Sequence, residues 1–391
     1  MKLRLGFHYH VPAMPGRAGI MTPGFQGRFL DALAAECEEV ICFLHTPRAD
    51  ETQFLDYRVQ SPNVHLVSIG AHASVPRRIL SAKRHVAPAK ARRQQLDVLL
   101  LRGPSPLLPA LARAAFPTPT ALLLVGDSTQ GIDDLPQPWW RKSLIRLFWR
   151  WNQHLQLHVA RTSLTFVNSR KLFEQLKNVV PDLRETRTTT LSSSDFFVRE
   201  DTCQTRPHRL LYAGRMDRGK GLLEITEAVV ELVSQGEDVV LDLAGPRERG
   251  DGVLDEIRRL AASRNVTDRI RYHGYKPLGP ELFALYQQAD LYVVASKSSE
   301  GFPRTIWEAM AHSVAVVATR VGSIPQLVDG AAELVPPNDV RSLSGAIRTL
   351  IHSPERRKEL IRNGRALASD MTLEKQVGKM VREIERFVTE K

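Results

Sequence analysis

The sequence of 391 residues has little cysteine and no long apolar run. Its cysteines, Cys37, Cys42 and Cys203, are odd in number and form no Cys-x-x-Cys pair, which predicts reduced thiols rather than a disulfide scaffold or a zinc site. No apolar stretch approaches the roughly 18 residues that span a bilayer. The apolar start, Leu3–Tyr9, is short for a signal peptide and predicts a first strand. These absences favour a cytoplasmic protein.

The chain also lacks low-complexity tracts and short repeats, and 43% of its residues are hydrophobic and 25% charged. This composition can fill ordinary cores, and the length predicts two or three domains. Charge is unevenly distributed. Residues 1–200 carry 26 Lys and Arg against 16 Asp and Glu, whereas residues 201–391 carry 28 against 27. We therefore expect the first half, and not the second, to meet an anionic partner.

Short apolar runs alternate with helical patterns in both halves, which predicts parallel sheets covered by helices. In the first half, a Gly/Pro-rich loop over Pro12–Gly27 precedes a helix expected at about Arg28–Glu38. The strands expected there are Leu3–Tyr9, Val40–Leu44, Val64–Ile69, Val98–Leu101, Ala121–Val125 and Leu164–Val167. Those expected in the second half are Arg209–Ala213, Val239–Ala244, Ile270–His273, Leu291–Ala295 and Val314–Ala318.

The stretch Ser192–Pro207 has no periodicity and is interpreted as a linker. We expect residues 1–200 to form one Rossmann-like domain and residues 205–371 another, facing each other across a cleft at the carboxyl ends of both sheets, where such folds bind ligands. The closing helix is expected at Thr372–Val388. We therefore expect the functional residues in the segments that directly follow the strands.

The first motif, Leu210–Gly221 (LLYAGRMDRGKG), runs from a strand into a glycine-rich turn and a helix. Glycines such as Gly214 let a backbone approach a phosphate, and Arg215 and Lys220 supply two cations for a diphosphate. A phosphate loop of nucleoside triphosphatases is a competing interpretation, because Gly-x4-Gly-Lys is present. However, Gly221 stands where that motif needs Ser or Thr to hold magnesium.

The second motif, EGFPRTIWEAMA, places two glutamates eight residues apart. Glu300 is expected in a loop, and Glu308 about one turn inside a helix that follows Pro303. Carboxylates in such a place accept hydrogen bonds from the hydroxyls of a sugar or a ribose. Exposed amides around Gly301–Phe302 suit a phosphate or sugar at the helix start.

These motifs resemble those of the retaining glycosyltransferases of the GT-B fold that carry a Glu-x7-Glu motif, family four. The resemblance is specific over about residues 205–330, and includes AGRMDRGKG, the strand ending in Ala244-Gly245-Pro246, YHGY at 272–275 and EGFPRTIWEAMA followed by VAVVATRVGSIPQLV. It is weaker but colinear in the first half, where Gly24 resembles the family's N-terminal glycine loop. It implies that the closing helix, about 372–391, returns to an acceptor-binding N-terminal domain.

The resemblance also implies roles for individual residues. Arg215 and Lys220 would hold the donor diphosphate, Glu308 the nucleotide ribose, and Glu300 the donor sugar. The positions that it assigns to the donor as a whole are Gly24, Gly214, Gly245, Gly274, Tyr275, Gly301, Phe302, Pro303 and Glu308. The loop of Gly274 and Tyr275 would lie beside the base.

One departure from the family pattern concerns a histidine that often follows an N-domain strand. Here Ala121–Val125 is followed by Gly126 and Asp127, so Asp127 either does related positioning work as part of the catalytic set or caps a turn. The alternative is that His8 or His10 supplies the histidine; both share one face of the first strand if that strand continues. A metal pair at these two histidines is the weaker alternative.

No Asp-x-Asp occurs, which disfavours the glycosyltransferase architecture that binds its donor through a divalent ion. We expect metal-independent chemistry without a cofactor, in which Arg215, Lys220 and helix dipoles stabilise the leaving group. The expected activity is transfer of a sugar from a nucleotide-diphosphate sugar to a saccharide or lipid-linked acceptor, in polysaccharide or glycolipid synthesis. A nucleotide-sugar epimerase of the same fold remains an alternative.

Two basic segments predict where the first half meets its anionic partner. Pro76–Arg93 holds seven Lys and Arg and no acid. Pro138–Trp151 holds four of the five tryptophans beside four basic residues. Basic, tryptophan-bearing helices lie at anionic bilayer surfaces, so peripheral docking on the inner face of the plasma membrane is expected. Core packing of the tryptophans is the alternative, and nucleic acid is disfavoured because no binding module is present.

Overall fold

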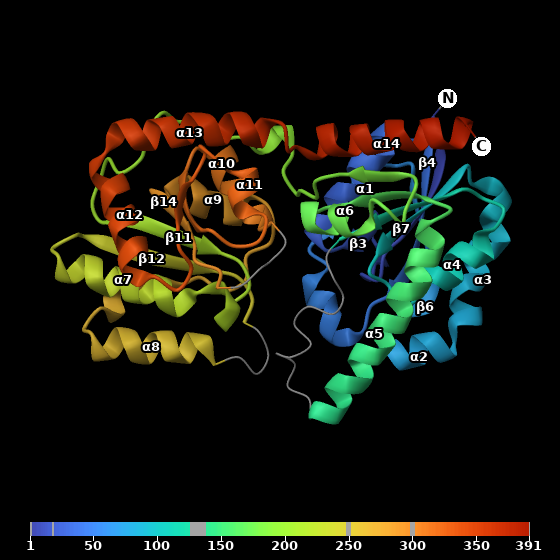
Figure 1. Cartoon of the computed structure of the whole chain (residues 1–391), viewed down its shortest axis with the longest axis horizontal. Helices are drawn as coiled ribbons and strands as arrows, with labels where there is room; N and C mark the ends of the chain where they lie inside the picture. Colours follow the sequence, from blue (N-terminus) through green and yellow to red (C-terminus); the bar gives the residue numbers. More distant parts are fainter. Residues whose placement is uncertain (1, 18, 126–137, 248–251, 298–301, 391) are drawn as a thin grey trace. The chain divides into compact units, whose positions relative to one another are not determined.

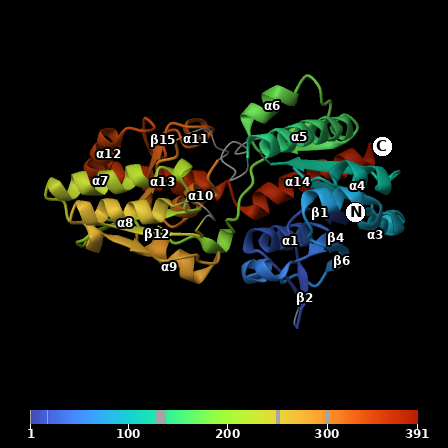
Figure 2. The same cartoon turned by 90° about the horizontal axis from the view of Figure 1, so that it is seen from below.

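A computed structural model of the chain describes residues 2–17, 19–125, 138–247, 252–297 and 302–390. The chain forms two compact units, residues 1–188 with 373–391 and residues 189–372. Each unit is built around one large parallel sheet, as the sequence predicts (Figures 1 and 2).

The first unit contains a seven-stranded parallel sheet in the order β10-β9-β8-β7-β1-β4-β6. Its strands are β1 Arg4–His8, β4 Glu39–Thr46, β6 Val64–Ala71, β7 Val98–Gly103, β8 Thr120–Leu124, β9 Leu164–Val167 and β10 Leu183–Glu185. A small antiparallel sheet joins β2 Met14–Gly16, β3 Gly19–Thr22 and β5 Tyr57–Arg58. The helices are α1 Gly24–Glu36, α2 Val75–Leu80, α3 Ala82–Arg92, α4 Leu108–Ala115, α5 Trp139–Ala160, α6 Arg170–Leu176 and α14 Leu373–Thr389.

The strands of this sheet send alternate side chains into two separate cores. Leu5, Phe7 and Leu100 pack against α1 and α14, whereas Phe43 and Leu99 pack toward α3 and α4. The closing helix α14 buries Leu373, Val377, Met380, Val381, Ile384 and Phe387 in the first of these cores. It therefore lies against α1 in the first unit, as the family resemblance implied (Figure 1).

The second unit contains a six-stranded parallel sheet in the order β13-β12-β11-β14-β15-β16. Its strands are β11 His208–Ala213, β12 Val239–Ala244, β13 Ile270–Tyr272, β14 Leu291–Val294, β15 Ala315–Thr319 and β16 Glu333–Val335. Its helices are α7 Leu222–Ser234, α8 Val253–Ser263, α9 Pro280–Gln288, α10 Arg304–Ala311, α11 Ile324–Leu327, α12 Val340–His352 and α13 Pro354–Ser369. Helices α7, α8 and α12 share one core, and α9 and α10 the other (Figure 2).

Two predicted boundaries are wrong. The helix expected at about Arg28 begins a turn earlier, at Gly24, whose amide donates to Asp56 Oδ1 at 2.8 Å, and the preceding loop contains β2 and β3. The expected linker 192–207 packs on the second unit, because the Arg199 guanidinium donates to four carbonyl groups, those of Tyr286, Gln287, Ala289 and Ser313. Side-chain hydrogen bonds hold this segment in place and leave no hydrophobic periodicity, so the sequence pattern could not predict its packing.

Candidate functional site

The residues singled out in the second half meet at one edge of the second sheet. In chain order its strands follow 3-2-1-4-5-6, so the direction of winding reverses between β11 and β14. Ligands of such folds bind outside the carboxyl ends of the strands at this switch point. The segments that follow β11, β12, β13 and β14 therefore form the candidate site.

Three glycines bring these segments into close backbone contact. Gly214 has φ +157° and Gly245 has φ +146°, and a Cβ atom on Gly245 would overlap the Gly214 carbonyl oxygen. Gly221, with φ +70°, approaches the Ala295 carbonyl group equally closely. Hydrogen bonds from Gly214 N to Ala244 O and from Gly245 N to Gly274 O continue the contact across the edge. We call the backbone surface formed by Gly214, Gly221 and Gly245 the glycine floor. Side chains are excluded from it because a Cβ atom at Gly221 or Gly245 would overlap the neighbouring backbone.

The two predicted cations, Arg215 and Lys220, lie in the segment between β11 and α7. The Arg215 side chain is 58% exposed and lies 3.8 Å from the Asp217 carboxylate, and Tyr212 donates its hydroxyl proton to the Arg215 carbonyl group. Lys220 closes a short 3-10 turn, Arg218–Lys220, directly before α7. The arrangement can offer two mobile positive charges and a helix start to an anionic ligand.

The phosphate-loop interpretation meets a steric obstacle at Gly221. That motif needs a hydroxyl-bearing residue at this position. The left-handed φ and the neighbouring Ala295 carbonyl group leave no room for a Cβ atom. The geometry therefore favours a phosphate-binding turn of another kind.

The segment after β13 contributes a loop rather than a charge. Gly274 has φ +71°, and Tyr275 is 41% exposed. Beside them, His273 Nε2 lies 2.6 Å from Asp242 Oδ1, and Asp242 also pairs with Arg209 at 2.9 Å. The exposed ring of Tyr275 suits stacking on a planar ligand.

Helix α10 carries the second motif. Pro303 is its N-cap residue, and the Phe302 ring stacks on Trp307 with centroids 4.2 Å apart. Glu308 is 4% exposed, and the sequence predicted its place one turn into the helix. The tryptophan anchors this part of α10 in the core.

Two hydroxyl groups hold the buried Glu308 carboxylate. Thr190 Oγ1 donates to Oε1 at 2.7 Å, and the Tyr286 hydroxyl donates to Oε2 at 3.0 Å. Burial, and then the Glu308 charge, raise the pKa of Tyr286 well above its usual value, so this hydroxyl remains a donor. Each carboxylate oxygen keeps a second lone pair for a ligand hydroxyl. Sequence reasoning missed Thr190 and Tyr286, which lie 118 and 22 residues from Glu308 and belong to no motif.

Several predicted residues lie elsewhere. Asp127, Glu300 and Gly301 fall outside the described residues. Gly24 lies in the first unit, at the start of α1. His8 and His10 also lie in the first unit, at and just beyond the end of β1. The roles assigned to all of these positions stay predictions.

Within the described ranges, one group of side chains brings three metal-ligand atoms within 4.8 Å of one another, namely Cys203, His208 and Asp290. It lies at the opposite, amino-terminal edge of the sheet, where β11 and β14 begin. Both Asp290 oxygens already accept backbone amides, from Cys203 and Arg209. Burial raises the pKa of Cys203 to about 11, which keeps it a thiol. Cys37 and Cys42 are buried and free, in keeping with the predicted reduced thiols.

The comparisons with known proteins agree with this geometry. Residues 195–367 match the family described as Glycosyl transferases group 1. The chain is 29% identical over 239 residues to an MMP alpha-(1->4)-mannosyltransferase of Mycolicibacterium hassiacum, covering 60% of this chain and 56% of that protein. It is 31% identical over 145 residues to a D-inositol 3-phosphate glycosyltransferase of Corynebacterium jeikeium, covering 36% of this chain and 34% of that protein. These matches thus span about a third to a half of the relatives' own length.

A crystal structure of Anabaena HepE in complex with UDP resembles the whole chain in fold, with a TM-score of 0.71, 16% identity and coverage of 99% of this chain and 100% of that one. The two units therefore have the GT-B fold. Residues 195–367, less than half of the chain, are thus similar to the group 1 glycosyltransferases, and the fold predicted from the sequence is confirmed.

The glycine floor makes a testable prediction. Gly245→Ala should lower the free energy of unfolding at least about twice as much as Gly236→Ala, because both glycines have positive φ but only Gly245 is packed against a backbone carbonyl group. Gly236, at φ +85° with no atom within 4 Å, isolates the backbone strain. Urea unfolding of both variants measures the difference. Equal losses would show that the close approach at Gly245 is not constraining.

Proposed function

We propose that this protein transfers a sugar, with retention of anomeric configuration, from a nucleotide-diphosphate sugar to a saccharide or lipid-linked acceptor in polysaccharide or glycolipid synthesis. One observation carries the proposal. The segment that matches the glycosyltransferase family, residues 195–367, is the segment whose sheet gathers the glycine floor, Arg215, Lys220 and Glu308 at its switch point. The UDP complex of Anabaena HepE supports a nucleotide donor.

The described residues divide the proposed work between binding and charge stabilisation. Arg215 and Lys220 attract the donor diphosphate and stabilise the charge that grows on it as the sugar–oxygen bond breaks. The glycine floor lets the diphosphate approach the backbone closely. Glu308, oriented by Thr190 and Tyr286, accepts hydrogen bonds from the ribose hydroxyls. The diphosphate thus leaves the sugar while the positive charges of Arg215 and Lys220 offset its growing negative charge.

A thermal-shift panel of UDP-, GDP-, ADP- and TDP-sugars tests the donor class, because a ligand that binds only the folded state raises its apparent stability. The best donor is then incubated with and without saccharide and lipid-linked acceptors. Transfer that depends on an acceptor supports the proposal. Conversion of the donor sugar without any acceptor would favour the epimerase, and stabilisation by none of the donors would contradict the proposal.

Arg215→Ala and Lys220→Ala should each reduce turnover by at least about a hundredfold, because each removes a charge that faces the leaving diphosphate. Arg264→Ala is a matched control, since Arg264 is an exposed arginine beyond the end of α8, outside the site. Initial-rate kinetics with the donor identified by the panel provide the measurement. Activity within a few-fold of wild type in both site variants would remove the diphosphate assignment.

Glu308→Gln should weaken nucleotide binding about tenfold or more, because a neutral amide replaces the carboxylate that faces the ribose. Thr190→Val, which leaves the charge and removes one orienting hydrogen bond, should cost only a few-fold. Isothermal titration with the nucleoside diphosphate compares the two variants, and circular dichroism checks that both are folded. Unchanged affinity in folded Glu308→Gln would contradict the ribose role.

We also propose that the first unit docks on an anionic bilayer. Helix α5 exposes three of its four tryptophans, Trp139 at 80%, Trp140 at 47% and Trp151 at 54%, so most of them lie outside the core. It also exposes Leu144 and Leu147. None of the helices in the described residues is long and apolar enough to cross a membrane. An apolar, basic helix of this kind suits the surface of a bilayer.

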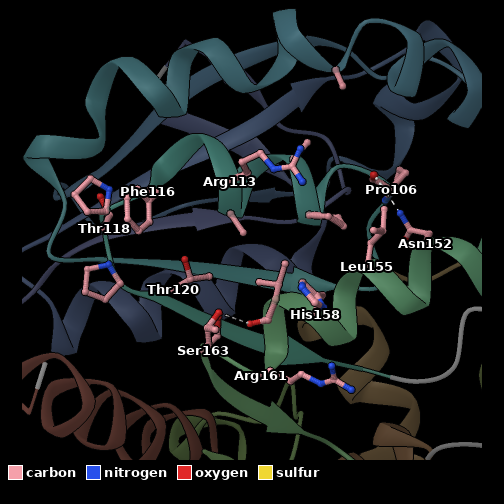
Figure 3. Close-up of a pocket in the computed structure, with 18 of the residues that line it drawn as sticks. Pro106, Arg113, Phe116, Thr118, Thr120, Asn152, Leu155, His158, Arg161 and Ser163 are labelled. Carbon is pink, nitrogen blue, oxygen red and sulfur yellow. Dashed lines mark hydrogen bonds between the residues drawn. The ribbon is translucent and has the colours of Figure 1, made fainter. Parts of the chain in front are cut away.

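A pocket of 1170 Å³ lies between the two basic segments. Ile79 and Ala82 contribute to it from one segment, and Trp151 from the other. Figure 3 shows Phe116 and Thr118 on one side of this pocket and Leu155 and Asn152 on the other. Its lining is largely apolar, with Arg113, His158 and Arg161 among its polar residues. Such a pocket suits the chain of a lipid whose anionic headgroup meets the basic side chains.

Not every basic residue of the segment 76–93 is available to a membrane, because Arg78 is buried. Arg77, Lys83, Arg84 and Lys90 are exposed. Changing these four to Ser should weaken binding to phosphatidylglycerol vesicles by at least about a hundredfold at low salt, since each basic residue at the surface contributes about 1 kcal/mol. Leu144→Ser with Leu147→Ser should weaken the salt-resistant part. Co-sedimentation with phosphatidylcholine vesicles is the control, and wild-type protein that stays in solution with anionic vesicles would contradict docking.

A further inference from the structure

Arg78 of α2 is a buried cation with unused donors. Its residue is 6% exposed, and neither Nε nor Nη1 has a hydrogen-bond partner among the described residues. A buried guanidinium without acceptors is costly, and native structures rarely keep one. Burial lowers the pKa of Arg78 from its ordinary value, yet the group stays charged at neutral pH. A missing acceptor is therefore the feature to explain.

The nearby acid does not supply that acceptor. Glu51 Oε1 accepts from Arg48 Nη2 at 2.8 Å and lies 2.7 Å from His72 Nδ1, and Oε2 accepts the Arg48 amide at 2.9 Å. No ion pair of 4.0 Å or less joins Glu51 to Arg78 within the described part of the chain. Glu51 is thus committed to Arg48 and His72.

Four histidines, His8, His10, His45 and His72, lie close enough to Arg78 for its charge to lower their pKa values, and three of them have an unused ring nitrogen. His45 Nδ1 lies 3.2 Å from the Gly70 carbonyl oxygen, which can only accept, so this nitrogen carries the proton and Nε2 keeps its lone pair. The same reasoning applies to His72, whose Nδ1 donates to Glu51. Both Nε2 atoms are buried without a partner, as is His10 Nδ1. Burial, followed by the charges of Arg78 or neighbouring rings, lowers the pKa of His10 and of His45 to about 3, so these rings are neutral at pH 7.

The cluster stands at the ligand-binding edge of the first sheet. His8 ends β1 and contacts Ser105 after β7 through Nε2 at 3.1 Å, His45 lies at the end of β4, and His72 follows β6. In chain order this sheet also reads 3-2-1-4-5-6, with β10 added, so its switch point falls between β1 and β7. Arg102, at the end of β7, stacks on the Tyr9 ring. The half-buried His10 and His72 form the less covered side of the cluster.

We propose that this cluster is a subsite for an oxyanion that carries or adjoins a hydroxyl group, such as the phosphate of a phosphorylated acceptor. The oxyanion would accept from Arg78 Nε and Nη1, and the hydroxyl would donate to the lone pair of His45 or of His72. Both unused donors of Arg78 and one of the unused ring nitrogens then gain partners of the right kind. The assignment of this oxyanion to the acceptor rests on the proposed function; the subsite itself does not.

Isothermal titration of the full chain with inorganic phosphate and with sulfate tests the subsite. Phosphate at pH 7 keeps a hydroxyl group and sulfate does not, so wild type should bind phosphate several-fold more tightly. Arg78→Gln should lower phosphate affinity about tenfold or more, because a hydrogen bond to a charged group is worth about 1.5–3 kcal/mol. His72→Phe, whose ring has no nitrogen lone pair, should reduce the preference for phosphate and leave sulfate affinity unchanged.

Two control variants locate the effect. Arg84→Gln changes an exposed base of the same segment, and Arg264→Gln changes an exposed arginine of the second unit, so neither should change phosphate affinity more than about twofold. Should Arg78→Gln fail to fold, Arg78→Lys keeps the charge without the planar fork and should lose part of the affinity. Absence of phosphate binding in wild type, or full affinity in folded Arg78→Gln, would overturn the subsite.

The source of the oxyanion and the fate of the proposed function are read separately. Glucose 6-phosphate represents a soluble acceptor and phosphatidic acid vesicles represent a lipid headgroup; the one whose binding Arg78→Gln weakens identifies the source, and weakening of neither would overturn the acceptor assignment. If no nucleotide sugar binds while phosphate binding depends on Arg78, the proposed function fails and the subsite stands. If sugar transfer occurs while phosphate binding ignores Arg78, only the subsite fails.

Discussion

The close approach of backbone to backbone at Gly214 and Gly245 is the constraint on which the second unit's site depends. Because a Cβ atom at Gly245 would overlap the Gly214 carbonyl group, the ends of β11 and β12 meet with no side chain between them. Gly221 repeats this contact with Ala295 after β14. The edge that results is formed by backbone, and Arg215 and Lys220 bring positive charge to it. A phosphate-bearing ligand needs this combination of access and charge.

Much of this arrangement could be predicted from the sequence, because local pattern determines it. The runs Leu164–Val167 and Val239–Ala244 are found with the predicted bounds. Buried parallel strands are apolar on both faces, so these elements leave clear traces in the sequence. The glycines of the first motif, Leu210–Gly221, are likewise recognisable in the sequence, because their conformational demands are local.

What the sequence could not predict depends on contacts between distant residues. Thr190 reaches Glu308 across 118 residues, and Arg199 joins a segment without periodicity to the end of α9. The same applies to the burial of Arg78, which in the sequence is one of seven bases in a run. Only the burial of its side chain separates Arg78 from its exposed neighbour Arg77. Hydrogen bonds and burial that depend on residues far apart in the chain produce no periodic sequence pattern, so they cannot be predicted from one.

The two halves of the chain thus differ in charge. The first half is basic, whereas the second is nearly neutral and contains the glycine floor. We propose above all that the donor diphosphate lies on that floor. A crystal structure of the full chain with its nucleoside diphosphate provides the test. We expect both phosphates beside Gly214, within hydrogen-bond distance of Arg215 and Lys220, and the ribose at Glu308. A nucleotide bound away from the carboxyl edge of the second sheet would contradict it.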